Sequence, residues 1–143
     1  MQRIIADQIF GLKAVKFQAS TDEITLSPNT SSTSSYTTTD VVSVKTFAPK
    51  LVIVLGMRKL ASSAAESIGW GTSTTTREVI NAGGATPQRQ NTRIMQVTQS
   101  ATDEMWADLT AVGTSSFSIQ YNAPSANSGS VTVLVFWLAL GWQ

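Results

Sequence analysis

Two adjacent pairs of carboxylates are the residues whose types could most directly do chemistry. Asp22-Glu23 and Asp103-Glu104 could supply oxygen ligands to Ca²⁺ or the two carboxyl groups of a glycoside hydrolase. Neighbouring residues in a strand point to opposite faces, so an adjacent pair in a strand cannot converge on one atom. Neither pair lies in a run with the spacing of a calcium-binding loop. We therefore interpret both pairs as solvated loop residues and expect no metal site.

The chain has 143 residues and contains no histidine and no cysteine. Ser-His-Asp, Cys-His and HExxH chemistry therefore cannot be assembled within one chain, and disulfides and zinc ribbons are excluded as well. The segments Gly69-Trp70-Gly71 and Gly83-Gly84 lack the pattern of a phosphate-binding loop, and we interpret them as turns. These absences predict a protein that is not an enzyme, needs no cofactor and works by binding.

The four tryptophans are the candidates for ligand binding, because sugars are held by an aromatic face together with hydroxyl, amide or carboxylate groups. Trp137 lies within an apolar run, which predicts a core position, and Trp106 could pack beneath a short helix. Trp70, flanked by glycines in polar sequence, is the best candidate for an exposed site, although a buried position fits the pattern equally well. Trp142 follows Gly141, and its position predicts packing against the chain's own sheet or a neighbouring subunit.

The charge pattern narrows the choice of partners. The formal net charge is +1, from ten basic and nine acidic residues, and neither sign forms a block. Such a chain lacks the basic surface that phosphate backbones and anionic lipids require. The most apolar run, residues 131–140, is interrupted by Thr and too short for a membrane span of about 20 residues. We expect neither nucleic acid nor a membrane as a partner.

Strand signals dominate the chain after residue 40, because β-branched residues recur in short runs bounded by Gly, Pro, Asn and Ser. The apolar run at 51–55 predicts a strand that is covered on both faces. Phe117, Ile119 and Tyr121 alternate with polar residues, which is typical of a half-buried strand. About seven or eight short strands without βα alternation predict an all-β fold, an antiparallel β-sandwich or jelly roll.

The chain length predicts a single domain. We expect residues 1–40 to form an N-terminal arm followed by a Ser/Thr-rich loop or edge strand, and residues 41–143 to form the sandwich. The two parts together make one domain. The composition changes abruptly to Ser and Thr between residues 20 and 40, which is the reason for placing the boundary there.

Two segments admit a helix. In the arm, residues 1–19, Ile5 and Ile9 could share a helix face, but the following residues also alternate as an extended chain would, so both alternatives stay open. Residues 103–109 could form one helical turn, with Thr102 as its N-cap and acidic side chains at the positive end of the helix dipole.

Two strand segments carry a resemblance to a known family. Phe47-Ala48-Pro49-Lys50 leads into the apolar run 51–56, and residues 133–141 have the sequence Val-Leu-Val-Phe-Trp-Leu-Ala-Leu-Gly. With the glycine-flanked segment 68–71 between them, residues 41–141 resemble a β-sandwich module of tailed-bacteriophage structural proteins, which is similar in layout to H-type lectin domains. The resemblance implies a virion component that is usually oligomeric and sometimes binds glycans.

The predicted function is that of a bacteriophage capsid decoration or cement protein, located in the virion. It would bind the shell as a homo-oligomer, such as a trimer, with the major capsid protein as a partner. The alternative is a carbohydrate-binding, lectin-like module of a tail tip or fibre, with Trp70 against the glycan. The candidate interface residues are Ile5 and Ile9 in the arm, and Trp142. No sugar-binding residue of the family can be matched in this sequence.

Overall fold

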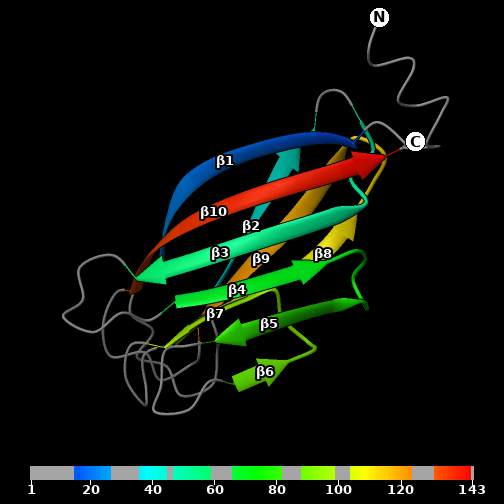
Figure 1. Cartoon of the computed structure of the whole chain (residues 1–143). Coiled ribbons are helices and arrows are strands. Elements are labelled where there is room, and N and C mark those ends of the chain that lie inside the picture. The colour runs from blue at the N-terminus through cyan, green and yellow to red at the C-terminus, as the bar shows by residue number, and fades with distance from the viewer. Residues whose placement is uncertain are drawn as a thin grey trace, which may run out of the picture.

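The computed structural model describes residues 15–26, 36–44, 47–58, 66–81, 88–98, 104–123 and 131–142. These residues form ten strands and no helix, arranged as two antiparallel sheets packed face to face (Figure 1). The predicted antiparallel β-sandwich is confirmed. It has ten strands instead of seven or eight: β6 (Gln88–Gln90) is only three residues long, and β8 (Glu104–Val112) forms where a helical turn was predicted. No helix in the described part of the chain is long and apolar enough to cross a membrane.

Six strands form the larger sheet, in the order β1-β10-β3-β4-β5-β6, and four form the smaller sheet, in the order β2-β9-β8-β7. The larger sheet lies in front of the smaller one in Figure 1. The strand bounds are β1 (Val15–Leu26), β2 (Tyr36–Ser43), β3 (Leu51–Arg58), β4 (Glu66–Gly71), β5 (Arg77–Asn81), β6 (Gln88–Gln90), β7 (Met95–Thr98), β8 (Glu104–Val112), β9 (Ser116–Ala123) and β10 (Val131–Trp142).

The longest pairing joins β1 and β10, whose register runs from Val15 opposite Trp142 to Leu26 opposite Val131. On its other side β10 pairs with β3, so the two apolar segments that carry the family resemblance are neighbours in the sheet. Residues 1–40 contain β1, an edge strand of the larger sheet, and the first part of β2, an edge strand of the smaller sheet. Ile5 and Ile9 lie outside the described residues.

The core lies between the sheets and is filled by the inward side chains of both. Phe117 on β9 and Trp137 on β10 meet edge to face, with ring centroids 5.3 Å apart and ring planes at 77°. Trp137 is 6% exposed, which confirms its predicted core position. The alternation predicted for Phe117, Ile119 and Tyr121 is also confirmed, since all three are fully buried.

A stripe of small residues on β4 allows β7 to lie directly on the larger sheet. The inward side of β4 carries Ser67, Gly69 and Gly71. The backbone N–H of Gln96 on β7 donates a hydrogen bond of 3.1 Å to the Ser67 hydroxyl. A Cβ at Gly69 would overlap the carbonyl oxygen of Ile94, so the glycine is required by a close backbone approach. The prediction of a turn at Gly69-Trp70-Gly71 is therefore wrong, while Gly83-Gly84 lies outside the described residues.

The helical turn predicted for residues 103–109 is also wrong, because residues 104–112 form strand β8. Met105, Ala107 and Leu109 are buried and alternate with partly exposed residues, which is the period of a strand. Pairing with β9 on one side and β7 on the other supplies the backbone hydrogen bonds that a single helical turn could not.

Candidate interaction surface

The outer face of the larger sheet can be traced from the strand register. On β3, Val52 and Val54 face the core, and Ile53 and Leu55, which alternate with them, face away from it. Residues directly opposite each other in an antiparallel pair share a face. Leu55 on β3 lies opposite Phe136 on β10 and opposite Ile68 on β4, so these three side chains share the outer face. The same register extends this face to β1 and β5.

Ten large apolar side chains in the described residues are exposed, and all ten lie on this outer face. Their exposed fractions run from 36% for Phe136 to 72% for Phe17. We call this surface the apolar face. Its exposed members are Val15 and Phe17 on β1, Leu134, Phe136 and Trp142 on β10, Leu55 and Met57 on β3, Ile68 and Trp70 on β4, and Ile80 on β5.

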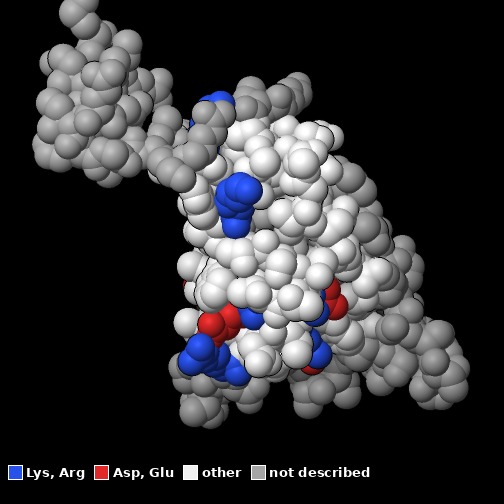
Figure 2. All heavy atoms as spheres, turned by 90° about the vertical axis from the view of Figure 1, so that its right-hand side faces the viewer, with Lys and Arg blue, Asp and Glu red and all other residues white. Residues whose placement is uncertain are grey.

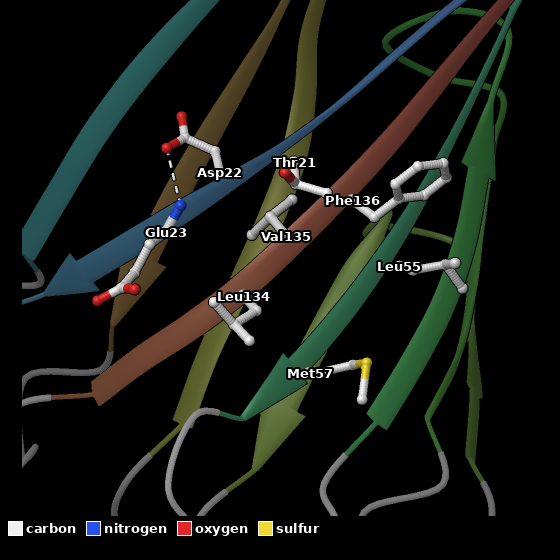
Figure 3. Close-up of a pocket in the computed structure, with 8 residues that line it drawn as sticks. All are labelled: Thr21, Asp22, Glu23, Leu55, Met57, Leu134, Val135 and Phe136. Atoms are coloured by element: carbon white, nitrogen blue, oxygen red, sulfur yellow. Dashed lines mark hydrogen bonds between the residues drawn. The ribbon is translucent and has the colours of Figure 1, made fainter.

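Two grooves hollow the apolar face. The larger, of about 560 Å³, lies over β1, β10 and β3. Figure 3 shows Leu134 and Phe136 from β10 beside Leu55 and Met57 from β3, with Thr21, Asp22 and Glu23 from β1 along the edge. The second groove, of about 400 Å³, lies over β3, β4 and β5 and shares Leu55 and Met57 with the first. Apolar side chains thus line most of both grooves.

Charged residues of the apolar face lie at its margins. Glu23 on β1 is opposite Leu134, and Glu66 on β4 is opposite Met57, so both mark the end of the sheet where β10 begins. Glu78 forms an ion pair with Arg89 near the β6 edge. Figure 2 views the molecule from the side where β10 ends; blue Lys or Arg atoms lie among uncharged white atoms in its middle, and red and blue groups lie together in its lower part. The described centre of the face carries no charge.

The outer face of the smaller sheet has the opposite character, because its polar groups bind one another. The Arg93 guanidinium lies 4.4 Å from the ring centroid of Trp106. Its Nη1 also donates a 2.7 Å hydrogen bond to Glu104 Oε1, and Gln96 Nε2 donates to the same oxygen at 2.9 Å. Trp106 is therefore covered by a cation on the outside of β8 instead of packing beneath a helix. This face can meet water without a partner.

Asp108, on the same outer face of β8, makes stability depend on pH. Burial raises the pKa of its carboxyl group, against the opposing effect of the positive charges of Arg77 and Arg93. The folded state then binds a proton more readily than the unfolded state, so this contribution to stability is present below about pH 4 and is lost as pH rises through the folded pKa. We expect Asp108→Asn to remove that loss, so its urea midpoint should fall less between pH 4 and pH 7 than that of the wild type.

The matched control for this measurement is Thr110→Ser, which changes an exposed, uncharged residue on the same strand β8. It should leave the wild-type pH dependence in place. Identical pH profiles for Asp108→Asn and the wild type would contradict the assignment of the loss to Asp108.

The sequence-predicted site residues fall in different places. Trp70 and Trp142 both belong to the apolar face, with 39% and 43% of their surface exposed. The acidic pairs do not converge: Asp22 and Glu23 sit in β1, opposite Val135 and Leu134 respectively. The loop interpretation of these two residues and of Glu104 is wrong, because all three are in strands. In the described residues no cluster of three or more acidic side chains could hold a metal ion.

The apolar face as a whole was not predicted, although a signal for it is present in the sequence. The segments that form β3 and β10 are apolar at nearly every position, which is the pattern of strands covered on both sides. The smaller sheet covers only one side of them. The apolar side of β3 and β10 that faces away from the smaller sheet forms the apolar face, and the described residues leave it exposed.

The fold and this surface define the class of the molecule: a two-sheet antiparallel β-sandwich with one apolar and one polar outer face. Comparison with protein-family models, with curated proteins and with solved structures gives no match.

Proposed function

We propose that this protein is a non-catalytic structural component of a bacteriophage particle, a capsid decoration or cement protein that binds the shell as a homo-oligomer. The observation that carries the assembly role is the apolar face. The phage setting comes from the resemblance of β3 and β10, with the β4 segment between them, to structural modules of tailed phages.

The extent of the apolar face supports a role in assembly. The largest apolar patch on a soluble monomer is typically about 300–600 Å² and is often functional. Here exposed apolar side chains continue across five adjacent strands, from Phe17 on β1 to Ile80 on β5. Burying these ten exposed side chains against a protein partner would lower the free energy by roughly 25 cal/mol for each Å² of apolar surface removed from water.

A glycan-binding module is the second candidate, and one observation favours it. Trp70 is 39% exposed, and Glu78 lies directly opposite it on β5. An aromatic ring and a carboxylate are therefore neighbours on this face. On its other side, however, Trp70 is opposite Ile53, and a sugar would meet apolar side chains there. A glycan array that compares the wild type with Trp70→Ala tests this role, and signal lost in the variant would favour it over decoration.

The decoration role makes a prediction about abundance. In purified particles of the phage that encodes the chain, quantitative mass spectrometry should find it in hundreds of copies per particle, because cement proteins occupy repeated positions of the shell. A handful of copies would favour the tail-tip or fibre alternative instead. Absence of the protein from washed particles would contradict a virion role altogether.

A further inference from the structure

The apolar face is large enough to form a stable interface with a similar surface. Strands lie about 4.8 Å apart and rise about 3.3 Å per residue, so the part spanned by β1, β10, β3, β4 and β5 has a projected area on the order of 600 Å². Two such faces in contact would bury on the order of 1,200 Å², which reaches the range of about 1,200–2,000 Å² for specific protein interfaces. A second sheet also packs naturally on a sheet, at about 10 Å.

Negative charge lies at one end of the apolar face. Glu23 and Glu66 mark the end where β10 begins, and each lines one of the two grooves. At the other end of the sheet Lys16 and Lys50, both exposed, line a pocket together with Trp142, a member of the apolar face. Lys16 itself starts from the inner side of β1, since it is opposite the buried Gly141. Lysine stems are long enough to carry their ammonium groups past the end of a sheet.

This distribution selects one relative orientation for two copies. A parallel arrangement would bring the two glutamate-bearing ends together, and like charges in contact are unfavourable. An antiparallel arrangement about a two-fold axis places Glu23 and Glu66 of each copy over the end that carries Lys16 and Lys50 of the other. The contact is then isologous, with the same patch used on both copies.

From area and charge together, we infer that the partner of the apolar face is a second copy of this chain, packed sheet on sheet about a two-fold axis with the strands antiparallel. The inference rests on the assembly role proposed above and specifies its self-contact. The outer face of the smaller sheet then stays free on both sides of the dimer and is available to the particle.

The oligomeric state of the full chain tests the contact. In sedimentation velocity the wild type should have twice the 15.3 kDa mass of the chain, or an even multiple of it. Phe136→Lys places a charge at the centre of the apolar face and should give monomers with an unchanged far-UV circular dichroism spectrum. The matched control Gln120→Lys, on the outer face of β9, should sediment as the wild type does.

Should Phe136→Lys fail to fold, the double variant Leu55→Thr and Phe136→Thr replaces the same centre with strand-forming residues, and it should also dissociate. A monomeric wild type would overturn the inference. That result is expected if another segment of the same chain, and not a second copy, covers the apolar face. A Thr double variant with the same sedimentation coefficient as the wild type would overturn it too.

Charge reversal tests the orientation. Glu23→Lys with Glu66→Lys should weaken dimerisation about tenfold, since several weak rim pairs are lost. Adding Lys16→Glu and Lys50→Glu should restore affinity to within about threefold of the wild type. Failure of the second pair to restore it would overturn the antiparallel arrangement.

The two proposals fail separately. A wild-type dimer that Phe136→Lys dissociates, in a protein absent from particles, would remove the virion role and leave the self-contact standing. A monomeric protein present in hundreds of copies per particle, whose attachment Phe136→Lys abolishes, would overturn the self-contact and keep the virion role, with the shell as the partner of the apolar face.

Discussion

Gly69→Ala should destabilise the fold by about 3 kcal/mol or more, a large part of the roughly 5–15 kcal/mol of a typical domain. The added Cβ would overlap the carbonyl oxygen of Ile94, approach its carbonyl carbon to 2.5 Å, and lie 2.8 Å from the carbonyl oxygen of Glu78. All three are backbone atoms, so no side-chain rotation can relieve the overlap. Relief requires β7 to move away from β4, which would break the hydrogen bond from the Gln96 N–H to Ser67.

Urea unfolding followed by circular dichroism measures this effect, and Gly113→Ala is its matched control. A Cβ at Gly113 would have Ser116 as its nearest neighbour, 3.5 Å away, which is ordinary van der Waals contact. Its stability should therefore stay within about 1 kcal/mol of the wild type. Equal midpoints for the two alanine variants would show that β7 does not rest on the backbone of β4 as described.

The segment around Gly69 also explains why part of the fold escaped prediction. Glycine flanking a tryptophan is a common turn signal, and nothing in the local sequence reveals that another strand must cross at that point. The requirement comes from a contact between residues 69 and 94, distant in the chain. In contrast, β9 and β10 were predictable because their alternation or continuous apolarity is a local property that the sandwich preserves.

The error at β8 has a different cause. Thr102 followed by two acidic residues is a legitimate helix start, and only the period of Met105, Ala107 and Leu109 argues for a strand. Pairing on both sides decides between the two, and pairing cannot be seen in one segment. Local capping signals are worth about 1 kcal/mol, which a central position in a sheet readily outweighs.

The candidate surface was predictable only in part. The sequence singles out Trp70 and Trp142 because of their unusual neighbours, and both lie on the apolar face. It does not reveal that Leu55, Ile68 and Phe136 stand beside one another, because that depends on the strand order β10-β3-β4. The apolarity of β3 and β10 is thus visible in the sequence, but the face itself depends on the strand order that places them beside β1 and β4.

Phe117→Ala should also cost about 3–5 kcal/mol, for a reason unlike that at Gly69. Phe117 is fully buried and packs edge to face on Trp137, so it joins the smaller sheet to the larger one. Its truncation leaves a cavity between two sheets whose backbones are held by their own ladders and cannot collapse freely. The thermal midpoint should fall by on the order of 10 °C, and the near-UV circular dichroism of Trp137 should weaken.

The neighbouring substitution Ser118→Ala is the matched control, because Ser118 points away from the core and contributes its carbonyl oxygen, which alanine retains, to the bond from Thr110. It should change the free energy of unfolding by no more than about 0.5 kcal/mol. Phe117→Leu should recover part of the loss, since it refills most of the volume without the aromatic edge. Equal thermal midpoints for Phe117→Ala and Ser118→Ala would show that the two sheets are not joined through Phe117 and Trp137. The apolar face would then lack the rigid support that sheet-on-sheet packing of two copies requires.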